Sequence, residues 1–139
     1  MRYLSVGDVA RIHEQELQDA EPIFDFGRLE SAVMRPQQTV GGQDAYPTLH
    51  LKAAALMHAL IRNHPFVDGN KRAAVIAVGT LYLLNGYSLE AEQGDVIALA
   101  VDVAEGQKTV EAIAKDLQQW SVAMDLKDFD EGEAGLLDD

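Results

Sequence analysis

Residues 64–72, HPFVDGNKR, combine in nine positions most of the groups that phosphate chemistry needs. A helix predicted to begin at Asn70 would present unpaired backbone amides to an anion at its first turn. Lys71 and Arg72 add two positive charges there, lysine as a point charge and arginine as a planar fork. Gly69 allows a ligand to approach the backbone closely. The beginning of this helix is therefore a predicted phosphate site.

Asp68 and His64 indicate what such a site could do. A carboxylate among cations is poorly suited to attract phosphate itself, but it suits a Mg²⁺ ion that bridges phosphate oxygens. An imidazole with a pKa of about 6.5 can accept a proton from a hydroxyl at neutral pH. Base, metal ligand and phosphate cradle together indicate phosphoryl or nucleotidyl transfer to a hydroxyl. The same residues would also suit a solvated turn with a capping histidine, and residue types alone leave both interpretations open.

Other catalytic signatures are absent from the sequence. It contains no GxxxxGK[ST] phosphate loop, no GxSxG elbow and no HExxH metal pair. The remaining histidines, His13, His50 and His58, fall in predicted helices without the spacing of a metal site, and we interpret them as structural or surface residues.

The elements that must position residues 64–72 are predicted to be helical. Pro65 ends the helix before the loop, and the run AAVIAVGTLYLL after it has no polar face. We therefore expect the helix that begins near Asn70 to be central and buried. The fold class is predicted to be all-α, a single-domain bundle of about six helices around that central helix. The predicted helices run from about Ser5 to Ala20, Phe26 to Met34, Thr48 to Arg62, Asn70 to Asn85, Gly94 to Glu105, and Thr109 to Trp120.

The segment QQTVGGQDAYP, residues 37–47, is predicted to be a loop or flap. Its glycine pair breaks regular structure, and Thr39 and Val40 could extend briefly along an edge. Gln43 and Tyr46 could help to position a peptide substrate, although Tyr-Pro is also an ordinary entry to the next helix.

Composition excludes several classes of protein. A chain of 139 residues makes one ordinary domain, and the absence of cysteine excludes a disulfide framework and a thiolate metal site. The formal net charge of −12 argues against direct binding to nucleic acid. The N-terminus becomes polar too early for a signal peptide, and the longest apolar run is too short to cross a bilayer. We expect a cytoplasmic protein that does not bind membranes.

The C-terminal end is predicted to form an acidic tail, residues 123–139, outside a domain of residues 1–122. Residues 125–139 carry seven acids and one lysine, which is half of the net charge. A disordered, solvated end explains this composition, and an interaction tail is the alternative.

HPFVDGNKR closely resembles the motif of the Fic/Doc family, H-x-F-x-[DE]-G-N-G-R-x-x-R, and the lysine after the asparagine is similar to the Doc branch. The resemblance covers roughly residues 2–122 and implies the Fic/Doc helical bundle with ATP and Mg²⁺ as cofactors. It implies the following roles: His64 as the base, Phe66 as the apolar anchor of the loop, Asp68 as the Mg²⁺ ligand, and Gly69, Asn70, Lys71 and Arg72 as nucleotide-binding residues.

Two departures from the full motif also resemble Doc. Lys71 replaces a glycine that many Fic proteins use for close approach of the backbone, and Val75 replaces the second arginine of AMP-transferring members. The resemblance therefore implies transfer of the ATP γ-phosphate to a threonine or serine of a target protein such as elongation factor Tu, which inhibits translation. AMP transfer by the same fold is the alternative, and a non-catalytic helical binding module is the second alternative. Doc-type toxins are neutralised by an antitoxin whose C-terminal segment occupies a groove on the toxin, so an antitoxin partner and an exposed apolar groove are also expected.

Overall fold

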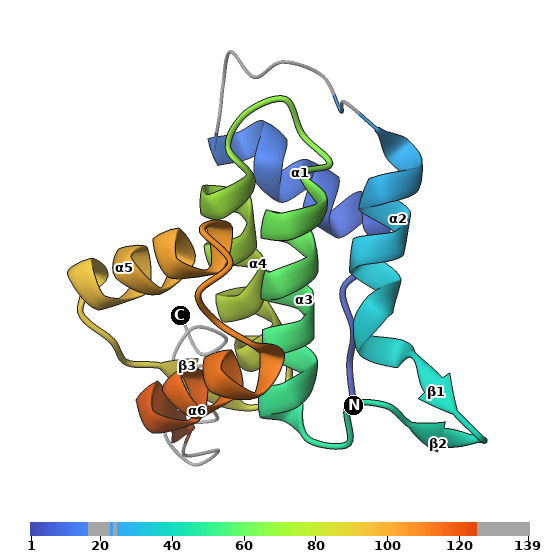
Figure 1. The fold of residues 1–139 in the computed structure, drawn as a ribbon. Helices are drawn as coiled ribbons and strands as arrows, with labels where there is room; N and C mark the ends of the chain where they lie inside the picture. The colour runs from blue at the N-terminus through green and yellow to red at the C-terminus, as the bar shows by residue number, and fades with distance from the viewer. Residues whose placement is uncertain (17–22, 24, 125–139) are drawn as a thin grey trace, which may run out of the picture.

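The computed structural model describes residues 1–16, 23 and 25–124. This part of the chain consists of α-helices connected by short loops, together with two small antiparallel strand pairs (Figure 1). The prediction of an all-α domain is confirmed for this part of the chain. None of the helices described is long and apolar enough to cross a membrane. The helices are α1 (Val6–Glu16), α2 (Phe26–Met34), α3 (Leu49–Asn63), α4 (Asn70–Leu84), α5 (Gln93–Ala104) and α6 (Val110–Trp120), with a 3₁₀ turn, η1 (Arg35–Gln37), directly after α2.

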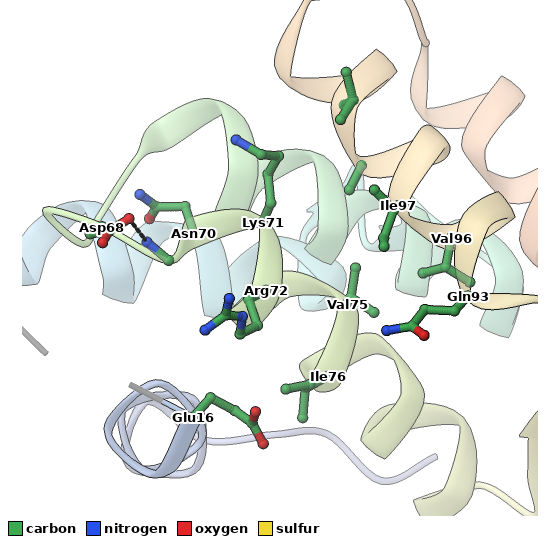
Figure 2. A pocket seen from close by; sticks show the side chains of 13 residues that line it. Glu16, Asp68, Asn70, Lys71, Arg72, Val75, Ile76, Gln93, Val96 and Ile97 are labelled. Carbon is green, nitrogen blue, oxygen red and sulfur yellow. Dashed lines mark hydrogen bonds between the residues drawn. The ribbon is translucent and has the colours of Figure 1, made fainter. Parts of the chain in front are cut away.

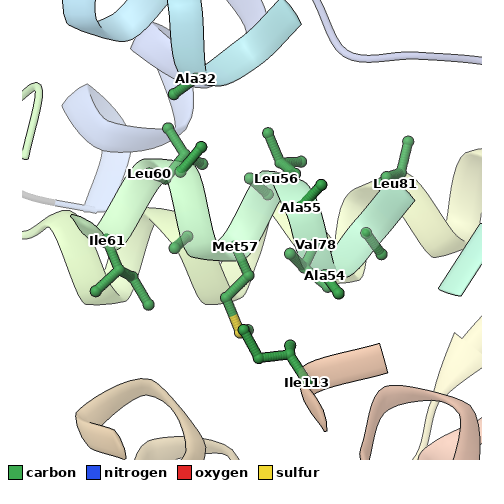
Figure 3. Close-up of a cluster of buried hydrophobic side chains, with 14 of the residues drawn as sticks. Ala32, Ala54, Ala55, Leu56, Met57, Leu60, Ile61, Val78, Leu81 and Ile113 are labelled. Atoms are coloured by element: carbon green, nitrogen blue, oxygen red, sulfur yellow. The ribbon is translucent and has the colours of Figure 1, made fainter. Parts of the chain in front are cut away.

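The helix at the centre of the bundle is α3, which packs against α2, α4, α5 and α6 (Figures 1 and 3). This corrects the expectation that the helix from Asn70 would be central. That helix, α4, is buried toward α3 but ends in a partly exposed turn, where Leu83 is 55% exposed. The reason lies in the alanines of α3, because small side chains let neighbouring helices approach on several sides. All four of these alanines are fully or almost fully buried: Ala53, Ala54, Ala55 and Ala59.

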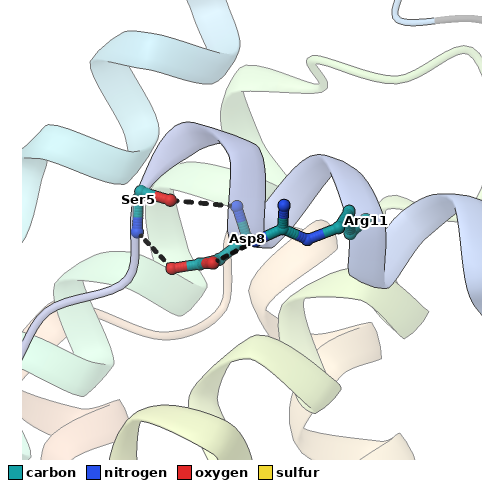
Figure 4. Close-up of polar contacts among 3 residues, drawn as sticks. All are labelled: Ser5, Asp8 and Arg11. Atoms are coloured by element: carbon teal, nitrogen blue, oxygen red, sulfur yellow. Dashed lines mark hydrogen bonds and ion pairs between the residues drawn. The ribbon is translucent and has the colours of Figure 1, made fainter.

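The first helix, α1, begins with a reciprocal cap between Ser5 and Asp8 (Figure 4). The amide of Asp8 donates to Oγ of Ser5 at 3.1 Å, and the amide of Ser5 donates to the Asp8 carboxylate at 2.8 Å. The hydrogen bonds from Ser5 lower the pKa of Asp8, and Arg11 adds an ion pair at 2.7 Å. The predicted end of this helix, near Ala20, lies outside the described residues.

Three other helices begin at a residue whose side chain accepts a backbone hydrogen bond, which explains why they start where the sequence predicts. Asp25 caps α2, Thr48 caps α3 and Thr109 caps α6.

The described residues form two antiparallel strand pairs, of which the first is a hairpin and the second joins strands on either side of α5 and α6. Strands β1 (Thr39–Val40) and β2 (Gln43–Asp44) pair around the two glycines. The sequence suggested the brief extension at Thr39 and Val40 but not its pairing with Gln43–Asp44. Strands β3 (Tyr87–Leu89) and β4 (Ser121–Ala123) were not predicted, and their pairing brings the segment after α6 against the turn after α4. Ala123 therefore belongs to the folded part of the chain. The acidic tail stays a prediction, because residues 125–139 lie outside the described residues.

Candidate active site

The loop of residues 64–69 is held in shape by the side chain of Asn70. Its amide oxygen accepts from the backbone amide of Phe66 at 3.0 Å, and its amide nitrogen donates to the Phe66 carbonyl at 2.9 Å. Both Asn70 and the Phe66 ring are buried. The role of Phe66 as the anchor of the loop is thus consistent with its position, and any contact of Asn70 with a ligand would fall to its backbone amide.

The same loop is held from outside by residues that precede α2 and by α1. The amide of Asp25 donates to the Pro65 carbonyl at 3.1 Å, and Ile23 forms an isolated antiparallel bridge with Phe66. From α1, Nε2 of His13 lies 2.7 Å from the backbone oxygen of Asp68, and the imidazole stacks on the Phe66 ring. The loop is therefore fixed on both sides.

A cavity of about 690 Å³ opens at the beginning of α4 (Figure 2). Five predicted site residues line it together: Asp68, Gly69, Asn70, Lys71 and Arg72. An apolar wall completes it, contributed by Val75 and Ile76 of α4 and by residues of α5 such as Val96, Ile97 and Val101. The cavity thus combines cationic groups at a helix N-terminus with apolar surface, an arrangement suited to a ligand that carries both phosphate and an apolar or aromatic part.

His64, at the first position of the loop, does not line this cavity. It is exposed and ends α3 with a left-handed backbone, φ 55° and ψ 57°. Among the described residues it is the one non-glycine position with positive φ. Pro65 disfavours a right-handed helical conformation at the residue before it, so the chain must leave the helix at His64. Backbone strain of this kind persists where the surroundings enforce it and is frequent at functional sites.

The imidazole of His64 also differs from the other three histidines, because no hydrogen bond of the described residues engages it. The others are committed within the fold: His13 to the backbone of Asp68, Nδ1 of His50 to the hydroxyl of Tyr82 at 2.8 Å, and Nδ1 of His58 to Arg35 at 2.8 Å. Burial lowers the pKa of His50 and His58 and raises that of Tyr82. The structural interpretation of these three is consistent with their contacts, and His64 is left available to an external group.

The residues present fit a magnesium ion that arrives with its phosphates. Within the described part of the chain, no group of three or more potential ligands lies together. Mg²⁺ is commonly held in proteins by one or two carboxylates plus waters and substrate oxygens. Asp68 supplies one exposed carboxylate at the cavity, beside the cations that would hold the phosphates.

Sequence reasoning missed what α1 contributes to the site. Besides His13, this helix places Glu16 in the lining of the cavity, where Figure 2 shows it beside Arg72 and Ile76. One signal was available for His13: a histidine that shares a helix face with Val9 is buried with it and must find a hydrogen-bond partner. No sequence signal shows that this partner is Asp68.

The segment interpreted as a flap lies away from the loop of residues 64–69. Strands β1 and β2 precede the first turn of α3, whereas His64 follows its last turn (Figure 1). A helix of 15 residues is about 22 Å long, so these two features lie at opposite ends of it. Gln43 therefore lies near the opposite end of α3 from His64. The Tyr46 hydroxyl accepts a hydrogen bond from Arg35 at 3.0 Å. The described structure gives neither residue a place in the cavity.

Comparison with known proteins identifies the family. A model of the Fic/DOC family matches residues 3–82, which include α1, the loop and most of α4. The chain belongs to the Fic/DOC family. It is also 46% identical over 107 residues to toxin Doc of Mycolicibacterium smegmatis, a match that covers 77% of each chain.

Proposed function

We propose that the protein is a Doc-like toxin of a toxin–antitoxin pair, a cytoplasmic enzyme that transfers the γ-phosphate of Mg-ATP to a serine or threonine hydroxyl of a target protein such as elongation factor Tu. The observation that carries this proposal is an exposed imidazole at His64, free of hydrogen bonds within the described residues, followed at the start of the next helix by a cavity that Lys71 and Arg72 line. The similarity to toxin Doc supports the toxin assignment.

Each residue would have a defined part in the transfer. His64 would take the proton of the target hydroxyl. The hydroxyl oxygen would form a bond to the γ-phosphorus while the bond between that phosphorus and the bridging oxygen breaks, so that ADP leaves. Lys71, Arg72 and the first amides of α4 would hold the phosphates, and Asp68 would hold Mg²⁺, which neutralises charge on the phosphate oxygens when bound. A solvent-exposed base suits a hydroxyl that arrives on another protein.

AMP transfer is the competing reaction, and the lining of the cavity disfavours it. AMP-transferring relatives carry a second arginine where this chain has Val75, and Val75 contributes apolar surface to the cavity. Incubation of elongation factor Tu with ATP labelled on either the γ- or the α-phosphate separates the two reactions. Label from the γ-phosphate alone supports the proposal, and label from the α-phosphate would replace it with AMP transfer.

The catalytic roles can be tested with single substitutions. His64→Ala should keep the fold and lose at least about 10²-fold in rate, as expected for a general base. Asp68→Ala should abolish the Mg²⁺ dependence of ATP binding measured by isothermal titration, whereas Glu111→Gln, an exposed acid on α6, should leave it unchanged. Binding of ATP without any metal dependence in the unmodified protein would favour the non-catalytic binding module.

The antitoxin is proposed to bind along the apolar wall of α5. Ile97 is 54% exposed and Val101 is also exposed, so one face of α5 offers apolar surface beside the cavity. An amphipathic segment of a partner could cover such a face. Co-expression with the product of a neighbouring short gene should relieve toxicity, and Ile97→Glu should weaken binding of that product to the purified protein.

A further inference from the structure

A residue outside the motif holds the metal-binding end of the loop. His13 lies on α1, 55 residues before Asp68 in the chain, and it is 4% exposed. Its Nε2 lies 2.7 Å from the Asp68 backbone oxygen, and its ring lies flat against Phe66, with centroids 3.7 Å apart and planes 4° apart. One imidazole therefore contacts both the apolar anchor and the carboxylate-bearing residue of the loop.

The direction of this hydrogen bond is fixed by its acceptor. A carbonyl oxygen only accepts, so Nε2 of His13 must carry the proton and donate it. This hydrogen bond acts as a brace between α1 and the loop.

Fixing the Asp68 carbonyl also fixes the amide of Gly69. The peptide unit between the two residues is planar, and its carbonyl oxygen and amide hydrogen point in opposite directions. With the oxygen turned toward α1, the amide of Gly69 points away from it and donates to Oδ1 of Asp68 at 2.7 Å. The orientation of one peptide therefore also decides where the Asp68 carboxylate lies.

We infer that His13 is a positioning residue, which holds the peptide between Asp68 and Gly69 so that the Asp68 carboxylate stays at the cavity, ready to bind Mg²⁺. The inference rests on the proposed function for the role of Asp68 but adds a residue from another helix. When a group that holds a metal ligand in place is removed, metal affinity or activity typically changes by about 10- to 100-fold.

Two substitutions separate the hydrogen bond from the stacking. His13→Phe keeps a flat ring against Phe66 but has no donor, whereas His13→Gln keeps an N–H donor at a similar reach but loses the ring. The Mg²⁺ concentration that gives half-maximal ATP binding should rise about tenfold in His13→Phe and stay within about twofold in His13→Gln. Binding of ATP without Mg²⁺ should be equal in both. A role in stability alone would lower the melting temperature without this difference in Mg²⁺ dependence.

A measurement on the protein without ligands separates the brace from the proposed function. The amide of Gly69 should exchange with solvent faster and shift in the NMR spectrum of His13→Phe, and should be close to normal in His13→Gln. An unchanged Gly69 amide in His13→Phe overturns the inference. A changed amide in a protein whose ATP binding ignores both Mg²⁺ and Asp68→Ala would keep the brace and overturn the proposed function. If His13→Phe does not fold, His13→Met, which is apolar and adaptable, takes its place.

Discussion

The left-handed backbone at His64 leads to a prediction about stability that is opposite in sign to the usual effect of glycine. At position 64, with φ 55°, a residue with a Cβ is strained by roughly 1–2 kcal/mol relative to glycine. Glycine in turn loses more conformational entropy on folding than alanine, by about 0.4–1 kcal/mol. The middle of each range leaves His64→Gly more stable than His64→Ala by about 0.8 kcal/mol.

This free energy is large enough to measure by thermal unfolding. With an entropy of unfolding of about 2.1 cal/mol/K per residue, a chain of 139 residues has about 0.3 kcal/mol/K in total. His64→Gly should therefore melt about 2–3 °C above His64→Ala, followed by circular dichroism at 222 nm. Both variants lack the imidazole and should show the same loss of transfer, so the added stability would come without any gain in activity.

Lys115 supplies the control for this comparison, because it is exposed in the interior of α6. There the backbone is an ordinary helix, and Lys115→Gly should be less stable than Lys115→Ala by about 1 kcal/mol. The two positions should thus show opposite orders of glycine and alanine. If His64→Ala is as stable as His64→Gly or more stable, the left-handed backbone at position 64 does not strain a residue with a Cβ.

Three further predictions concern other parts of the site and fold. Asn70→Ala removes the two hydrogen bonds that its side chain makes to the buried amide and carbonyl of Phe66. The free energy of unfolding, measured by urea denaturation, should therefore fall by roughly 2–4 kcal/mol. A loss below about 1 kcal/mol would show that water replaces these hydrogen bonds. Burial and the neighbouring charge of Arg35 hold the pKa of His58 below its ordinary value of 6.5, so the unfolded chain gains its proton first as the pH falls. The contribution of His58 to stability should therefore be complete above pH 6.5 and decline below it. This decline should be smaller in His58→Asn, which keeps an acceptor for Arg35. Equal pH profiles of the two proteins would contradict the lowered pKa of His58. Glu16→Gln removes a negative charge from the cavity and should tighten ATP binding about twofold to fivefold at low salt but not at high salt, whereas weaker binding would mean that Glu16 contacts the ligand favourably.

Much of the site was predictable because its signals are local. The proline after His64, the glycine before Asn70 and the apolar run that follows define a loop and a helix start within one short stretch. Helix beginnings at Ser5 and Thr48 follow from side-chain caps that need only the next three residues. The chemistry proposed for residues 64–72 likewise depends on residue types that lie next to one another.

Packing between helices could not be predicted in the same way. The sequence marks one apolar face on α3 and an apolar run in α4, yet the alanines of α3 give it the central place because they admit close neighbours. The strands β3 and β4 are three residues each, too short to show a period in the sequence.

The sequence by itself determined where the loop begins and ends, which residues it carries and where the helix after it starts, since caps, prolines and glycines act over a few positions. Only the tertiary structure decided that His13 and Glu16 of α1 reach that loop and its cavity, and that the Asn70 side chain is used to hold Phe66. Contacts across 55 residues depend on how the helices pack, and no short stretch of sequence encodes that arrangement.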